Sequence, residues 1–154
     1  MYKKIWTLIT ILGLMGSNQP SVKAENDPLA PYRWQNRLLL VFAPKVKDDR
    51  LVTIKQKLAE ARCEFDSRDL LLGVLTTDAP NIVGNETLSA YDVAALRAKY
   101  GIKSNQFAVI LIGKDGQPKS QLSEVPELEQ IFGRIDTMPM RQDEMANSSN
   151  SCKS

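Results

Sequence analysis

Six apolar residues in succession, Leu38 to Ala43, constrain the fold of this chain more than any other stretch. A run without polar alternation is typical of a strand that is covered on both faces, as in the middle of a parallel sheet. Pro44 has no N–H to donate to a neighbouring strand, so it ends the run. Ligands of open α/β sheets bind where such strands end, and we therefore expect any site to begin at Pro44.

The first 24 residues have the three-part organisation of a secretory signal peptide. Lys3 and Lys4 give a positive start, Ile5 to Met15 carries no charge, and Val22-Lys23-Ala24 supplies small residues at the cleavage positions. The apolar run is shorter than the roughly 20 residues that a membrane-spanning helix needs. We expect cleavage after Ala24, export to the periplasm or the extracellular space, and no stable membrane span afterwards.

The charge of the chain depends on this leader. The whole chain has 20 basic and 18 acidic residues, a net charge of +2, but residues 1–24 hold three of the basic residues and no acidic one. The remaining 130 residues therefore carry a net charge of −1, which removes the main support for a nucleic-acid partner. They suffice for one domain, expected over residues 25–145, followed by a small polar tail over 146–154 that we expect to be disordered.

Hydrophobic periodicity predicts the order strand, helix, strand, helix, strand, strand, helix. After the first strand we expect a helix that is capped by Asp48 or Asp49 and buries a stripe of Leu51, Ile54, Leu58 and Ala61. A second strand over 70–75 and a long loop over 76–86 lead to a helix that is capped by Ser89 and Asp92 and ended by Gly101. A strand over 107–112, an edge strand over 117–122 and a helix opened by Pro126 complete the expected domain. Tyr32 and Trp34 are expected to pack over the sheet edge. Two crossovers followed by a hairpin and a closing helix predict an α/β, thioredoxin-like fold (βαβαββα) with a central mixed sheet flanked by helices. A flavodoxin-like sheet is the alternative, but it needs more crossover units than are present here.

The absence of histidine narrows the possible chemistry. With no His in the chain, a Ser-His-Asp triad, a His-based metal site and His acid–base catalysis are all excluded. Asp48 and Asp49 could hold a cation, but adjacent carboxylates before a helix are more often caps. We expect no metal and no cofactor.

The segment VFAP followed by a helix resembles the part of thioredoxins and peroxiredoxins where a strand delivers a reactive cysteine to a helix amino terminus. Val46 and Asp49 stand about where the redox cysteines of thioredoxin would be. The stretch from Tyr100 to Gly116 resembles the thioredoxin segment with a cis-proline, yet Gln106 and Phe107 occupy that place. The chain therefore resembles the backbone frame of these proteins, but it has no CxxC motif, no peroxidatic cysteine and no cis-proline at these places.

A wider resemblance covers most of the chain after the leader. The pieces YRWQNRLLLVFAP, RDLLLGVL, LIGKDG and IDTMPMRQDEM resemble a secreted domain family of unknown function, which stands alone in bacteria. That family is related to the peroxiredoxin-like domains of animal sushi-repeat and matrix-associated proteins. The resemblance implies a thioredoxin-like fold and export, and it supplies no catalytic residues.

The two cysteines allow several states after export. Cys63 lies off the apolar stripe at the end of its expected helix, and Cys152 lies in the tail. They could form an intramolecular disulfide, stay free, or pair with another molecule. Neither follows a strand directly, which argues against a catalytic pair at the usual position.

The closing segment Ile135–Met145 allows two interpretations. Asp136, Arg141 and Glu144 could form a recognition surface, or they could form an ion-paired cap that holds the last helix, which we favour. Its three methionines, Met138, Met140 and Met145, are expected to fill space against the core.

Two functional hypotheses follow. The first is an exported, redox-inactive module that binds an extracytoplasmic protein or a small ligand; the second is an atypical thiol oxidoreductase that uses Cys63, Cys152 or both. On the first, the loops at the strand ends should lie together and form the site. Its candidate residues are Lys45, Val46, Lys47, Asp48, Asp49, Arg50, Thr76, Thr77, Asp78, Gln106 and Phe107.

Overall fold

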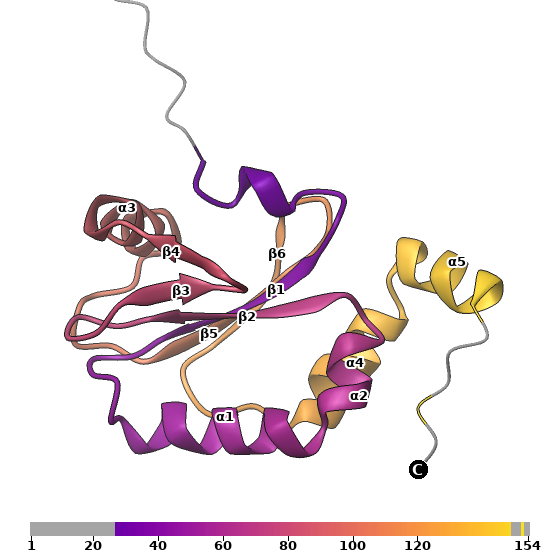
Figure 1. Ribbon diagram of the computed structural model, residues 1–154, viewed down its shortest axis with the longest axis horizontal. Helices are drawn as coiled ribbons and strands as arrows, with labels where there is room; N and C mark the ends of the chain where they lie inside the picture. Colours follow the sequence, from indigo (N-terminus) through magenta and orange to yellow (C-terminus); the bar gives the residue numbers. More distant parts are fainter. Residues whose placement is uncertain (1–26, 149–151, 153–154) are drawn as a thin grey trace, which may run out of the picture.

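A six-stranded mixed sheet with helices on both faces forms the body of the protein (Figure 1). The computed structural model describes residues 27–148 and Cys152, so the predicted leader, residues 1–24, lies outside the described residues. The strands are β1 (Arg37–Phe42), β2 (Leu70–Leu75), β3 (Asn81–Val83), β4 (Glu86–Leu88), β5 (Ala108–Ile112) and β6 (Pro118–Leu122), in the spatial order β4-β3-β2-β1-β5-β6. The helices are α1 (Asp49–Glu60), α2 (Arg62–Asp66), α3 (Ala90–Tyr100), α4 (Leu128–Asp136) and α5 (Pro139–Asn147), preceded by a 3-10 turn over Ala30–Tyr32.

The predicted apolar strand is the centre of this sheet. β1 pairs in parallel with β2 and antiparallel with β5, so its surroundings are mixed and not purely parallel as the run had suggested. All six residues of β1 are buried. Leu39 and Val41 face one core with α1 and α4, whereas Leu40 and Phe42 face the other with α3. Figure 1 shows α1, α2 and α4 on one side of the sheet and α3 on the other, and the thioredoxin-like prediction is confirmed.

Local sequence signals fix the helix ends as predicted. The Asp48 side chain caps α1 by accepting a hydrogen bond from the Arg50 N–H. Ser89 and Asp92 form a complete capping box at the start of α3. Gly101 ends α3 with φ +67°, a left-handed conformation that costs glycine little.

The predicted long loop over residues 76–86 is wrong, because this stretch contains a hairpin. β3 and β4 pair antiparallel around a two-residue turn of Gly84 and Asn85, with Gly84 at φ +58°. Glycine at the first turn position is typical of a tight hairpin turn. Each strand has only three residues, too few for a visible period-two pattern, and β3 gains its stability by pairing with β2.

The carboxyl-terminal region also differs from the prediction. α4 begins at Leu128 with Glu127 as its N-cap, two residues after the Pro126 start that we expected. α5 continues to Asn147, so the expected disordered tail is wrong for residues 146 and 147. Residues 149–151 and 153–154 lie outside the described part of the chain. Within the described part, no helix combines the length and the apolar character needed to span a membrane.

Because β2 packs closely against β1, alanine substitution should affect stability differently at two glycines. A Cβ on Gly73 would lie 2.5 Å from Leu40 Cδ2, whereas a Cβ on Gly133 in α4 meets nothing within 4 Å. Gly73→Ala should lower the free energy of unfolding by about 1–3 kcal/mol through overpacking. Gly133→Ala should raise it by about 0.5–1 kcal/mol, because alanine loses less backbone entropy in a helix. Urea unfolding of both variants measures the difference, and equal effects would contradict the packing described for β1 and β2.

Candidate functional site

The three segments predicted to form the site meet at one end of the sheet. The Val46 N–H donates to Asp78 Oδ1 at 2.8 Å, and the Thr77 hydroxyl donates to the Pro44 carbonyl at 2.6 Å. The Arg50 guanidinium lies 4.4 Å from the centre of the Phe107 ring. We call the combined residues 44–50, 76–78 and 106–107 the strand-end surface. The structure brings these residues together, and their role in binding stays a prediction.

Asp48 is the principal charged group of this surface. Its carboxylate accepts hydrogen bonds from the Arg50 side chain at 2.9 and 2.7 Å. The hydrogen bond from Arg50 lowers the pKa of Asp48 below its ordinary value, although partial burial acts in the opposite direction. The turn therefore holds a carboxylate at the amino terminus of α1, one residue before Asp49, which resembles the position of a thioredoxin cysteine.

Arg97 lies behind the strand-end surface and was not identified from the sequence. It is 8 % exposed, and its guanidinium donates to the carbonyls of Ala43 and Leu75, both at 3.3 Å, and to that of Lys103 at 2.9 Å. Burial lowers the pKa of Arg97 from its ordinary value. This side chain satisfies the carbonyls where β1 and β2 end, and so it fixes the platform from which the loops leave.

The two cysteines lie away from that turn and are joined to each other. The structure contains a disulfide between Cys63 and Cys152, with Cα atoms 5.8 Å apart. Cys63 belongs to α2, beyond the far end of α1, and not to the end of the first helix as expected. The bond anchors the segment that follows α5 to the opposite side of the domain from the strand-end surface.

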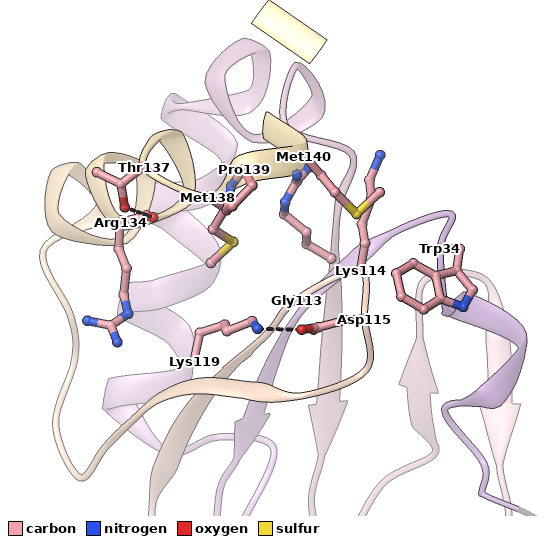
Figure 2. A pocket seen from close by; sticks show the side chains of 11 residues that line it. Trp34, Gly113, Lys114, Asp115, Lys119, Arg134, Thr137, Met138, Pro139 and Met140 are labelled. Atoms are coloured by element: carbon pink, nitrogen blue, oxygen red, sulfur yellow. Dashed lines mark hydrogen bonds and ion pairs between the residues drawn. The ribbon is translucent and has the colours of Figure 1, made fainter. Parts of the chain in front are cut away.

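A cavity of about 620 Å³ lies at the other end of the sheet, where β1 begins. Its walls are Trp34, the turn between β5 and β6, and the junction between α4 and α5 (Figure 2). Figure 2 shows the Lys119–Asp115 ion pair along one wall and the side chains of Met138 and Met140 above it. Trp34 is 66 % exposed, so the expectation that it packs over the sheet edge is wrong; Tyr32 alone packs there, against the α3 core.

The predicted ion-paired cap stands beside this cavity. Glu144 of α5 accepts from Arg37 at 3.0 and 3.1 Å and pairs with Lys114 at 2.7 Å, while Asp136 pairs with Arg68 and Arg141. Arg37 is 1 % exposed. Of the methionines in this segment, Met138 packs against the core as expected, whereas Met140 and Met145 are exposed.

The described residues hold no cluster of three or more acidic or cysteine side chains that could bind a metal ion. Many of the polar groups at both ends are instead engaged in ion pairs and backbone hydrogen bonds.

The solved structures that resemble this fold include peroxiredoxins. The reduced 2-Cys peroxiredoxin of Plasmodium vivax superposes with a TM-score of 0.56 at 17% identity, over 75% of this chain and 84% of that one. The mitochondrial 2-Cys peroxiredoxin of Plasmodium falciparum gives 0.54 at 15% identity, over 81% and 86%. These likenesses show the fold alone, which is thioredoxin-like.

Residues 28–144 match the model of a domain of unknown function (DUF4174), and the chain belongs to this family. Coiled-coil domain-containing protein 80 of Danio rerio is 28% identical over 134 residues, which are 77% of this chain. The match spans only 16% of that relative's length.

The ion-paired cap predicts how stability depends on pH. Burial alone would raise the pKa values of Asp136 and Glu144. Hydrogen bonds from Arg68 and Arg141 instead lower the pKa of Asp136 below its ordinary value of 3.8. Hydrogen bonds from Arg37 and Lys114 lower the pKa of Glu144 below its ordinary value of 4.5. A carboxyl whose folded pKa is depressed stabilises the fold above its unfolded pKa and loses this effect as the pH falls through the folded pKa. We expect the free energy of unfolding to fall as the pH drops below about 4.5.

Glu144→Gln tests this prediction at neutral pH. It should lower the free energy of unfolding by about 1–3 kcal/mol, since it leaves buried Arg37 without its charged acceptor, and it should flatten the acid limb of the stability profile. Glu124→Gln, at an exposed site with no ion pair among the described residues, should change stability by less than about 0.5 kcal/mol. Equal pH profiles for the two variants would show that the cap does not stabilise the domain.

Proposed function

We propose that this chain is an exported binding module that has the thioredoxin-like frame without its thiol chemistry. The observation that carries the proposal is the turn between β1 and α1, where Asp48 caps the helix and pairs with Arg50. Thiol-dependent reduction of a disulfide or a peroxide needs a thiolate at this position. The segment from Pro44 to Arg50 contains no cysteine.

The position of the disulfide supports the same proposal. α1 has 12 residues, which at about 1.5 Å per residue separate Cys63 from the strand-to-helix turn by roughly 18 Å. A bond between α2 and the segment after α5 closes a loop with a sequence separation of 89 residues. Such a bond chiefly limits the freedom of the unfolded chain, and this is a stabilising role and not a catalytic one.

Two features support the proposal that the protein functions outside the cytoplasm. Residues 1–24 have the charge and hydropathy pattern of a secretory leader. A disulfide persists in oxidising compartments and is rarely stable in the cytosol. The partner is then an extracytoplasmic protein or a small ligand, and the strand-end surface offers a fixed platform for it because its loops are tied to one another and to Arg97.

Thiol measurements separate this proposal from an atypical oxidoreductase. We expect no titratable thiol before reduction and two after it, with no peroxide consumption and no thiol-dependent reduction of insulin. A Cys63→Ser, Cys152→Ser double variant should keep the fold and its binding, but it should lose as much as about 4–5 kcal/mol of stability in the chain-entropy model. A 2-Cys peroxiredoxin assayed in parallel is the positive control.

Two outcomes would contradict the proposal. One is a disulfide that forms within seconds of adding peroxide to the reduced chain. The other is a folded double variant that has lost its activity in the exporting cell, because this would give the sulfur atoms a role beyond stability.

Export itself makes a direct prediction. The chain recovered from the envelope fraction or the medium should begin at Glu25, and its mass should be that of the disulfide form. Substituting Ala24 with a large residue should block cleavage, because signal peptidase requires small residues at its recognition positions. Mass spectrometry of the cytoplasmic and exported fractions measures both, and an uncleaved chain confined to the cytoplasm would refute this part of the proposal.

A further inference from the structure

We propose that the cavity beside Trp34 binds a small organic anion with a planar aromatic body. This inference rests on the proposed binding function and names a ligand class for it. The volume of about 620 Å³ lies within the range of roughly 300–1,000 Å³ that is usual for small-molecule sites. The cavity has an apolar part and a cationic part, and its surroundings carry an excess of positive charge.

The apolar part depends on the conformation of Trp34. Its φ is +65°, a region that a bulky side chain rarely adopts. The strain is held by a hydrogen bond of 2.6 Å from the Trp34 N–H to the Lys114 carbonyl, in the turn that forms another wall of the cavity. Such strain persists where the surrounding structure fixes it, often at ligand sites. The result is an exposed indole beside the flexible side chains of Met138 and Met140, a surface suited to a flat ring (Figure 2).

The cationic part faces this apolar surface. Arg134 has no side-chain hydrogen bond or ion pair within the part of the chain that the structure describes, and Figure 2 shows it across the cavity from Trp34. Lys119 is bound only to Asp115 there, in a half-buried pair of single charges, and one such pair contributes little enough to stability that Lys119 can exchange it for a ligand. Both can therefore donate to a carboxylate, sulfonate or phosphate.

One buried donor and the amino terminus of a helix add positive charge at the same wall of the cavity. Arg37 lines the cavity and is 1 % exposed, and its Nε–H has no hydrogen-bond acceptor. α5 begins at the cavity wall with Pro139, and no side chain caps it, so N–H groups of its first turn lack a side-chain acceptor. The Nε–H of Arg37 has almost no accessible surface, so it adds positive potential behind the cavity wall and does not itself contact a ligand.

The local charge balance favours an anionic ligand over a neutral one. The charged residues that line the cavity, together with the ion-pair network beside them, comprise six cations and four carboxylates. This leaves an excess of two positive charges. The charged residues are Arg37, Arg68, Lys114, Lys119, Arg134 and Arg141 against Asp69, Asp115, Asp136 and Glu144. The domain as a whole is nearly neutral, so the excess is local.

Calorimetric titration with three probes tests the proposal on the full chain. The probes are 2-naphthoate, which has both ring and charge, 2-naphthalenemethanol, which lacks the charge, and acetate, which lacks the ring. We expect 2-naphthoate to bind at least about tenfold more tightly than either, and its affinity to fall with added salt. In a Trp6→Phe background, Trp34 is the sole tryptophan, and its fluorescence should change on binding.

Matched variants locate the binding. Trp34→Ala and Arg134→Gln should each raise the Kd for 2-naphthoate by about tenfold. Tyr91→Ala and Arg62→Gln remove an equally exposed ring and an exposed guanidinium elsewhere and should leave the Kd unchanged. Should Trp34→Ala fail to fold, chemical-shift changes of the Trp34 indole N–H in the unsubstituted chain give the same information.

The proposal is overturned if 2-naphthoate binds no better than the alcohol, or if Trp34→Ala and Arg134→Gln bind it as the unsubstituted chain does. If one of these results is found and the chain shows no activity in the thiol assays, the proposed ligand class is refuted and the proposed binding function is not. Thiol turnover would refute the proposed function, whatever the cavity binds.

Discussion

Burial of β1 on both faces is the constraint on which the rest of the structure depends. Its hydrogen bonds run to β2 and β5, and no side chain from Arg37 to Phe42 reaches solvent. The polar groups at its two ends must therefore find partners inside the protein. At the carboxyl end, Arg97 donates to the carbonyls of Ala43 and Leu75. At the amino end, Arg37 donates to the Arg68 carbonyl and to Glu144. A buried arginine thus closes each end of the central strand.

The turn after β1 holds an anion at the amino terminus of α1. The amino terminus of a helix stabilises an anion, whether it is a thiolate or a carboxylate. Asp48 takes this stabilisation through the Arg50 N–H, and the Arg50 side chain adds a second positive partner. A carboxylate so held is ionised at neutral pH and cannot form a disulfide.

The sequence was sufficient for elements that carry their own local signals. The apolar run of β1, the capping box at Ser89 and the glycine at the end of α3 each predict a boundary without knowledge of the rest of the fold. The β3–β4 hairpin was missed because its three-residue strands depend on pairing with β2. The roles of Arg37 and Arg97 were missed because an arginine is ordinarily exposed, and only its tertiary partners make its burial favourable.

The same reasoning explains why the strand-end surface was predictable and the cavity was not. Strand ends can be read from the chain, and topology alone brings three of them together. The cavity requires Trp34, the β5–β6 turn and the α4–α5 junction to meet, which depends on long-range packing. The two ends also differ in what they leave unsatisfied. At the strand-end surface, Asp48, Asp78 and Arg50 have partners, whereas Lys45, Lys47 and Asp49 have no side-chain hydrogen bond or ion pair among the described residues. At the cavity, Arg134 and the Nε–H of Arg37 have none among the described residues. Binding free energy comes from groups that gain partners in the complex, and at the cavity Arg134 and Lys119 lie beside the exposed ring of Trp34, a combination that the strand-end surface does not offer because its one aromatic residue, Phe107, is buried.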